Sequence, residues 1–232
     1  KLLFGTAGIP FSTPDRNTID GIKQVKNLGL GAMELEFVRS VNISEEKARE
    51  VKKVADENDV VLTCHAPYYI NLNAAEKSKL NASIKRIIDS ARILNLCGGW
   101  SVCFHPGYYL QMEKEKVYET IKKNLKEVMK TLNNEGINMW VRPETTGRAT
   151  AFGDIYELIN LSSEIENVLP CIDFAHLHAR SCGKFNTTEE FEQVLSTVEK
   201  KLGKKALENM HIHMAGINYG DKGELNHLNL KN

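Results

Sequence analysis

The sequence predicts an α/β protein, a (β/α)8 TIM barrel whose C-terminal strand and helix are missing from this 232-residue chain. Short apolar segments alternate with longer amphipathic ones, which is the pattern of repeated strand–helix units in a parallel sheet. Seven strands with six intervening helices favour a barrel over an open doubly wound sheet. No Gly-x-Gly-x-x-Gly follows the first strand, so the dinucleotide-binding form of the open sheet has no support. Because no linker or low-complexity tract divides residues 1–232, we expect a single domain.

Each element is predicted from its periodicity and its boundary residues. Short apolar runs predict strands at residues 2–6, 32–37, 60–64, 101–104, 139–142, 169–172 and 211–214. Apolar residues at helical spacing predict helices at residues 18–28, 44–58, 74–96, 114–134, 154–163 and 188–202. Gly29 closes the first helix, and Ser44 caps the second.

Composition and charge narrow the class of protein. The chain is 42% hydrophobic and 26% charged, as ordinary globular proteins are. Its 30 Lys and Arg residues equal its 30 Asp and Glu residues, so nucleic acid would have to be held by a local basic rim rather than by bulk charge. No apolar run approaches the ~18–20 residues that span a bilayer. Five cysteines without a Cys-x-x-Cys predict no disulfide framework, and we expect a cytoplasmic protein without membrane or organic-cofactor partners.

The positions of the seven histidines are the most informative feature of the sequence. Six lie in or directly after a predicted strand, one lies in the loop after the last strand, and none lies on a predicted helix: His65, His105, His176, His178, His211, His213 and His227. Two carboxylates occupy equivalent places, Glu144 after the fifth strand and Asp173 after the sixth. In a (β/α) barrel these strand ends meet at one mouth, where the chemistry of the fold takes place.

A mouth lined by imidazoles and carboxylates predicts a metal centre. These donors suit Zn²⁺ or another borderline ion such as Mn²⁺, and with so many ligands we expect two or three ions bridged by a carboxylate. A single histidine at a strand end is more often an ordinary polar residue. His178 and His213, each beside a better-placed neighbour, are equally well explained as supporting residues. Cys64, Cys103 and Cys171 lie in apolar strands and are expected to be buried hydrophobic residues.

Four segments resemble the motifs of endonuclease IV, the metal-dependent apurinic/apyrimidinic endonuclease. They are residues 65–71 (HAPYYIN), 104–107 (FHPG), 143–147 (PETTG) and 171–176 (CIDFAH). They occur in order and with suitable spacing, and the likeness runs from residue 3 to about residue 227. Each motif alone is shared with the wider xylose-isomerase-like barrels, whereas four in register are fairly specific.

This resemblance implies a trinuclear zinc centre. The implied ligands are His65 and His105 on one ion, Glu144 bridging it to a second ion that Asp173 and His211 also bind, and His176 and His227 on the third. The family carries an aspartate at the position of Leu225, so Glu224 or Asp221 would have to replace it here. The family's last glutamate ligand, on the eighth strand, lies beyond the end of this chain.

The activity implied by the resemblance is cleavage of double-stranded DNA on the 5′ side of an abasic site, leaving a 3′-hydroxyl. The nucleophile is a metal-activated hydroxide, and Glu144, as bridging ligand, is the candidate catalytic residue. Such an enzyme rotates its target nucleotide out of the duplex, which costs least where the base is missing. Tyr68 matches a family position that orients the DNA, and Arg39 and Arg148 lie on loops of the same mouth as candidates for phosphate contacts. Each of these loop residues is equally well explained as a solvated side chain.

Two other functions remain open from the sequence. A sugar isomerase or epimerase on the same barrel uses one divalent ion and a Glu, Asp, His, Glu set, of which Glu144, Asp173 and His211 supply three. The additional histidines favour more than one ion and therefore the nuclease. The missing end of the barrel and Leu225 leave a third alternative, a protein that binds damaged DNA without cutting it.

Overall fold

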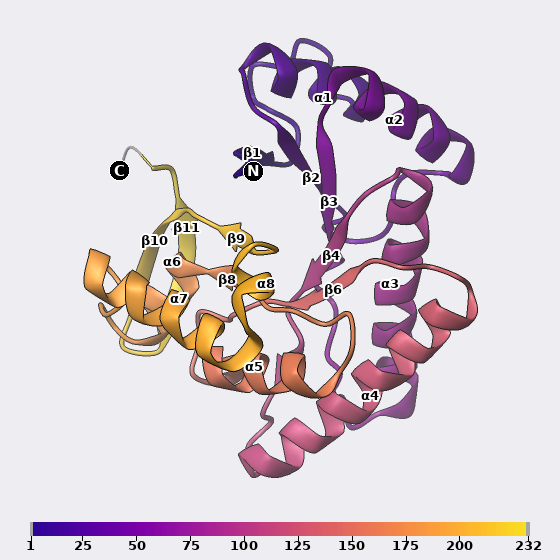
Figure 1. Cartoon of the computed structure of the whole chain (residues 1–232). Coiled ribbons are helices and arrows are strands. Elements are labelled where there is room, and N and C mark those ends of the chain that lie inside the picture. The colour runs from indigo at the N-terminus through magenta and orange to yellow at the C-terminus, as the bar shows by residue number, and fades with distance from the viewer. Residues whose placement is uncertain (1, 231–232) are drawn as a thin grey trace. The chain divides into compact units, whose positions relative to one another are not determined.

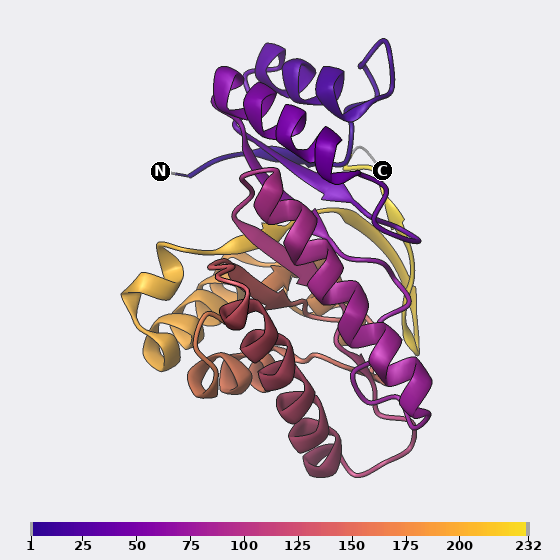
Figure 2. The same cartoon turned by 90° about the vertical axis from the view of Figure 1, so that its right-hand side faces the viewer.

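The computed structural model describes residues 2–230, which divide into two compact units (Figures 1 and 2). Unit 1 contains the residues up to Ile70 together with Asn81–Phe104 and Val128–Val141. Unit 2 contains Asn71–Leu80, His105–Glu127 and the residues from Arg142 onward. Three elements contribute residues to both units: α3 (Lys77–Leu96), α4 (Lys114–Asn134) and β6 (Trp140–Pro143).

Unit 1 is built on a parallel sheet. Its strands are β1 (Gly5–Ala7), β2 (Ala32–Glu36), β3 (Val61–His65) and β4 (Ser101–Phe104), in that order, followed by β6. The pairs from β1 to β4 are parallel, with Ala32 beside both Gly5 and Val61. Parallel pairing of consecutive strands requires a crossover connection, which helices provide here. The predicted alternation of strands and helices is confirmed in this unit.

The first two helices of unit 1 lie side by side (Figure 2). The side chain of Asn17 caps α1 (Thr18–Asn27), and that of Ser44 caps α2 (Glu45–Asn58). Each helix buries one stripe of residues at a spacing of three or four, namely Ile19, Ile22 and Val25 on α1 and Ala48, Val51 and Ala55 on α2. Full burial of an isoleucine or valine contributes about 1.5–3 kcal/mol, so these stripes decide which face of each helix turns inward.

Unit 2 contains the later strands of the parallel series. β8 (Cys171–Asp173) pairs in parallel with β9 (His211–His213), and Glu144, directly after β6, makes a parallel bridge to Cys171. The carboxyl ends of β6, β8 and β9 therefore lie in a row, which positions the candidate site. The other elements that begin in this unit are β5 (Gly107–Tyr108), β7 (Ala151–Phe152), α5 (Ile155–Glu164), α6 (Phe174–Arg180), α7 (Thr188–Leu202), α8 (Lys204–Leu207), β10 (Gly216–Gly220) and β11 (Gly223–Leu228).

Two antiparallel pairs extend unit 2 beyond the strand–helix pattern. β5 pairs with β7, and β10 pairs with β11 to form a hairpin that packs on α6 (Figure 1). Neither pair was predicted, because their residues show no sustained alternation of apolar and polar side chains. The hairpin matters for function because it carries His227.

Two placements made from the sequence are wrong. His176 and His178 lie on α6, a helix of seven residues that starts directly at the end of β8 because the Asp173 side chain caps it. His227 lies on β11 and not in a loop. The first strand is also displaced, to Gly5–Ala7 instead of residues 2–6. Helices of about two turns and short hairpins contain too few residues for a periodic pattern to show.

The five cysteines are free thiols. Cys64, Cys103 and Cys171 are buried, as predicted, and so is Cys97, whereas Cys182 is exposed. Burial raises the pKa of Cys64 well above its usual value and that of Cys97 to about 12, so both thiols stay protonated near neutral pH and are poor ligands or nucleophiles.

Within residues 2–230, no helix combines the length and the apolar character needed to cross a membrane.

Candidate metal centre

Three side chains meet at the row of strand ends in unit 2. Glu144 follows β6, Asp173 ends β8 and His213 ends β9, where the parallel register sets Asp173 beside His213. One potential ligand atom of each lies within 4.8 Å of those of the other two. Glu144 and Asp173 are only 1% and 2% exposed. Carboxylates buried to this degree require a cation or several hydrogen-bond donors.

Both oxygens of the Glu144 carboxylate face imidazole nitrogens. Oε1 lies 3.1 Å from His213 Nδ1 and 3.3 Å from His176 Nδ1. Oε2 lies 3.2 Å from His105 Nε2. A carboxylate whose two oxygens face different donors has the geometry to bridge two ions.

Asp173 is held through its backbone and through its side chain. The Thr145 hydroxyl accepts from the Asp173 amide at 2.8 Å and donates to the Asp173 carbonyl at 3.1 Å. Asp173 Oδ1 accepts from the His176 amide at 2.8 Å and thereby caps α6, while Oδ2 lies 3.5 Å from His176 Nδ1. The end of β8, the first turn of α6 and the His176 ring are therefore fixed in one hydrogen-bonded network.

A second group of donors lies at the other edge of the His176 ring. The Nε2 atoms of His176 and His227 are 3.2 Å apart, and a ligand atom of Asp173 lies within 4.8 Å of both residues' ligand atoms. The His176 Nδ1 carries a proton, because it faces the carbonyl oxygen of Thr145 at 2.8 Å. In the neutral ring this leaves the lone pair on Nε2, the nitrogen that faces His227.

These two groups fit divalent metal ions. Tetrahedral Zn²⁺ with Zn–N bonds of about 2.0–2.1 Å holds two imidazole nitrogens about 3.3 Å apart. The Nε2 atoms of His176 and His227 are separated by 3.2 Å. Imidazole nitrogens combined with carboxylate oxygens are the donors that zinc and manganese use. Because Asp173 belongs to both groups, the two metal positions would be neighbours.

Burial and mutual attraction shift the pKa values of this cluster. Burial alone would raise the pKa of Glu144, but His213 and His105 hold it well below its usual value. Burial raises the pKa of Asp173 although His176 opposes the shift. Burial would lower the pKa of His176, yet Glu144 and Asp173 raise it to about 9. Without a metal ion, His176 is therefore protonated at neutral pH, and a bound ion must displace that proton.

The metal-free protein is expected to lose stability as the pH rises above neutral. The pKa of His176 is about 9 in the folded protein against a usual 6.5, so its contribution is complete below pH 6.5 and is lost as the pH passes through 9. This shift corresponds to at most about 3 kcal/mol of unfolding free energy. Urea unfolding at about pH 6.5 and about pH 9.5, with a chelator present, measures the loss. His176→Asn should remove most of it, and equal wild-type stability at both pH values would contradict the assignment.

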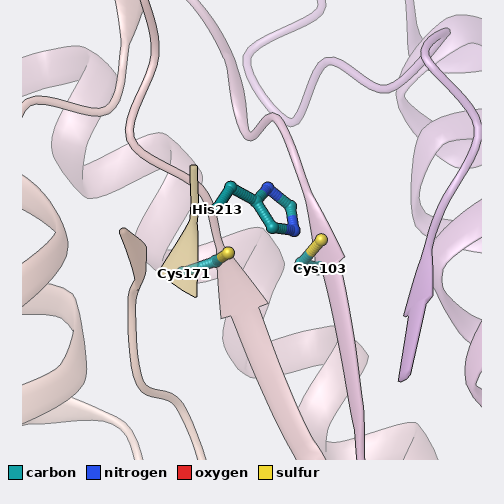
Figure 3. Close-up of side chains that lie close together, drawn as sticks. All are labelled: Cys103, Cys171 and His213. Carbon is teal, nitrogen blue, oxygen red and sulfur yellow. The ribbon is translucent and has the colours of Figure 1, made fainter. Parts of the chain in front are cut away.

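Five of the seven predicted ligands meet in unit 2. They are His105, Glu144, Asp173, His176 and His227. The histidine of β9 that faces Glu144 is His213 and not the predicted His211, which pairs with Cys171 further back along β8. Figure 3 shows His213 with Cys171 on these neighbouring strands; Cys103, drawn in the same view, belongs to unit 1.

Three further residues of unit 2 were considered as ligands or supporting residues, and only one of them lies at a donor group. His178 points away from both groups, since its Nδ1 donates to the Lys184 carbonyl at 2.8 Å and its ring meets Tyr219 edge-on at 4.9 Å. Of the two substitutes considered for Leu225, Glu224 lies at the second group, with Oε2 3.6 Å from His176 Nε2. Asp221 is exposed at the turn of the hairpin.

Three of the predicted site residues lie in unit 1. His65 ends β3 and is buried, and its Nδ1 donates to the Ala66 carbonyl at 2.7 Å. Tyr68 is 53% exposed, and its ring meets that of His65 edge-on at 5.6 Å. Arg39 is exposed in the turn after β2.

Two glutamates of unit 1 were missed by the sequence reasoning. Glu34 is buried on β2 and accepts from the Thr63 hydroxyl at 3.1 Å, and Glu36 lies beside His65 in the register of β2 and β3. The sequence did contain a signal for them, since both glutamates fall inside a predicted strand. A carboxylate is costly to bury there and usually serves a purpose.

The loop after Glu144 is held from two sides within unit 2. Arg148 is exposed, and its Nε donates to the Glu224 carbonyl at 3.1 Å. Arg180 of α6 donates to the Thr146 hydroxyl at 3.1 Å and to the Ala151 carbonyl at 2.9 Å. Arg148 is therefore presented to solvent on a loop whose backbone is fixed.

A family model described as the xylose isomerase-like TIM barrel matches residues 22–231. The chain belongs to this family. The TIM-barrel fold predicted from the sequence is thereby confirmed.

Two relatives of this chain carry different names. An uncharacterized protein of Methanocaldococcus jannaschii is 47% identical over 229 residues, which are 99% of this chain and 82% of that protein. A protein of Mycoplasma mobile named probable endonuclease 4 is 30% identical over 148 residues, 60% of this chain and 50% of its own length. This chain thus matches only about half of that relative.

Solved structures of the same barrel include both a nuclease and an epimerase-like protein. Endonuclease IV from Thermus thermophilus superposes with a TM-score of 0.73 at 20% identity, covering 98% of this chain and 81% of that one. A D-tagatose 3-epimerase-like protein superposes with a TM-score of 0.71 at 16% identity, covering 95% and 79%. At these identities the likeness establishes the fold and leaves the reaction to be argued from the site.

Proposed function

We propose that this protein is a zinc-dependent phosphodiesterase that cleaves double-stranded DNA 5′ to abasic sites and leaves a 3′-hydroxyl. The observation that carries the proposal is the second donor group, Asp173, His176 and His227, directly beside the group of Glu144, Asp173 and His213. Two neighbouring ions that share a carboxylate are the arrangement used for phosphodiester hydrolysis, whereas a sugar epimerase needs only one ion. The sequence motifs that resemble endonuclease IV, and the relative named probable endonuclease 4, also support it.

The reaction requires a nucleophile and neutralisation of charge at the phosphorus. Bound divalent ions would supply Lewis acidity and lower the pKa of a water molecule so that hydroxide is available near neutral pH. Glu144 and Asp173 provide buried negative charge that holds the ions, and the three imidazoles around Glu144 fix its orientation. His105 is the most solvent-exposed member of this set, at 34% against 19% for His213, so the phosphate is proposed to approach from its side.

Exposed residues of each unit are proposed to contact the DNA. In unit 2, Arg148 is presented on the fixed loop after Glu144 and would neutralise a phosphate of the backbone. In unit 1, exposed Arg39 is a second candidate for a phosphate contact, and the exposed ring of Tyr68 is suited to stack on a base next to the gap. His65 is proposed as a further metal ligand, as the resemblance implies.

A second candidate function is a single-metal sugar epimerase. Glu144, Asp173 and His213 form a complete three-residue group by themselves, and they would suffice for one ion that binds a ketose. The similar barrels of D-psicose 3-epimerases agree with this alternative. It gives no role to the close approach of His176 and His227, which is why we favour the nuclease.

The deciding experiment is an incision assay. The zinc-loaded protein is incubated with a duplex carrying one tetrahydrofuran abasic analogue, and the same duplex without the lesion is the control. We expect a single cut 5′ to the lesion whose product a DNA polymerase extends. Binding of the lesion without a cut would support the non-cutting binder instead. Absence of both binding and incision, with one metal ion per chain and turnover of a ketose, would support the epimerase.

Removal of the metal is expected to abolish the incision slowly. The ligands Glu144, Asp173 and His176 are almost fully buried, so a chelator must wait for the ions to dissociate. We expect activity to decay during incubation with EDTA and to return on addition of Zn²⁺, and to a different extent with Mn²⁺. Incision kinetics sampled alongside metal analysis measure both effects. Full activity after all metal has been removed would contradict the proposed chemistry.

A further inference from the structure

The hairpin of β10 and β11 contains a β-bulge at Leu225. Asn218 pairs with Asn226, but the next residue of β10, Tyr219, pairs with Glu224. Leu225 is therefore an extra residue on β11 with no partner in the register. Bulges occur next to active sites and re-aim the side chains that follow them.

The bulge changes the face on which Glu224 lies. In a regular strand, residues an even number apart share a face, so Glu224 and His227 would point to opposite sides. Paired residues share a face, and Ile217 and Tyr219 lie on one face of β10. Ile217 pairs with His227 and Tyr219 pairs with Glu224, so the bulge brings Glu224 and His227 to the same face.

The contacts of Glu224 agree with this orientation. Its Oε2 lies 3.6 Å from His176 Nε2, and its Oε1 lies 3.9 Å from His227 Nε2. Its side chain is 21% exposed, whereas the bulged Leu225 is 59% exposed. Glu224 thus places a carboxylate beside the two imidazole nitrogens that are 3.2 Å apart.

The backbone of Glu224 is fixed on the loop after Glu144. Its amide donates to the Gly147 carbonyl at 2.9 Å, and its own carbonyl accepts from Arg148 Nε at 3.1 Å. A Cβ atom on Gly223 would lie 2.2 Å from the Gly147 oxygen, so only glycine permits this approach. The hairpin and the loop are therefore joined through their backbones next to the second donor group.

We propose that Glu224 is a ligand of a divalent cation together with His176, His227 and Asp173, and that this cation holds the hairpin against the loop of Gly147 and Arg148. Two nitrogens and two carboxylate oxygens complete a four-coordinate site. A cation here would link the hairpin to α6 and β8 through His227 and Glu224 on one side and His176 and Asp173 on the other. The inference rests on the metal dependence of the proposed function and not on its DNA substrate.

The test combines zinc binding with hydrogen exchange. Zn²⁺ is titrated into chelator-treated protein, and amide exchange is followed in residues 216–228. In the wild-type protein we expect zinc to slow exchange in the hairpin. Glu224→Gln is expected to weaken one zinc site at least about tenfold and to abolish most of the zinc-dependent protection.

Two matched variants act as controls. Asp221→Asn removes an exposed carboxylate from the turn of the same hairpin and should leave zinc binding and protection unchanged. Glu224→Asp keeps the carboxylate but shortens the side chain, and it should retain more zinc binding and protection than Glu224→Gln. Exchange in β2 and β3 reports whether each variant is folded.

Three outcomes would overturn the proposal: unchanged zinc binding in Glu224→Gln, hairpin protection that does not depend on zinc, or equal losses of zinc binding in Glu224→Gln and Asp221→Asn. Each of these outcomes concerns zinc binding at the hairpin, so it can be told apart from a failure to incise abasic DNA. A protein that shows the zinc-dependent protection but never incises abasic DNA retains this site and loses the nuclease assignment.

Discussion

Glu144→Gln is expected to abolish turnover while leaving the chain folded. The glutamine keeps the size of the side chain but removes the charge that both His105 and His213 face. We expect kcat/KM for the abasic duplex to fall at least about a thousandfold, which corresponds to about 4 kcal/mol of lost transition-state stabilisation. Single-turnover incision with excess enzyme measures the loss without interference from product release.

The matched control for this variant is Glu189→Gln. Glu189 is exposed in the first turn of α7, and neutralising it should leave the incision rate within about twofold. Thermal unfolding of both variants reports whether they are folded. Retention of most activity by Glu144→Gln would remove Glu144 from the proposed chemistry.

His213→Asn and His211→Asn are expected to have very different effects on zinc binding and incision, although both residues lie on the same three-residue strand. His213 Nδ1 lies 3.1 Å from Glu144 Oε1, whereas His211 pairs with Cys171 at a point further from the strand end. We expect His213→Asn to lower zinc affinity at one site at least about tenfold and incision at least about a hundredfold. We expect His211→Asn to change both by less than about threefold.

Zinc content after dialysis and incision rates are measured on the two variants side by side. The rings of His211 and His213 pack edge-on at 5.0 Å, so a purely structural effect would appear in both variants. A larger loss of zinc and of incision in His211→Asn than in His213→Asn would show that His211 is the ligand, as the resemblance in the sequence implied.

Most of the fold could be predicted because its longer elements carry strong periodic patterns. The strand at residues 101–104 and the helices at 114–134 and 188–202 agree with the structure at both ends. β4 is buried throughout and three of its four residues are apolar, and α4 and α7 repeat apolar residues over several turns. Among the elements that escaped prediction, α6 depends on a cap and the β10–β11 hairpin contains a bulge, and both features arise from single residues.

The sequence predicted which strand ends carry the candidate site. It did not predict which residues pair across neighbouring strands, and therefore which histidine of β9 faces Glu144. Glu144 and Asp173 follow from the rule that barrel chemistry gathers at carboxyl ends. Choosing between His211 and His213 requires knowing which residue pairs with Asp173, and a shift of two residues preserves the apolar pattern. Glu224 was only one of two alternatives, because a bulge at Leu225 leaves no trace in the order of polar and apolar residues.

The helix cap formed by Asp173 bears on which ions the centre can select. Its Oδ1 already accepts from the His176 amide at 2.8 Å, so Oδ2 is the oxygen left to approach a cation. A carboxylate used in this way offers cations a single oxygen, which the two neighbouring positions would have to share. Calcium favours six to eight oxygen donors and often takes carboxylates through both oxygens, whereas zinc is satisfied by four ligands. The start of α6 therefore disfavours large, oxygen-seeking cations at this position before any nitrogen ligand is considered.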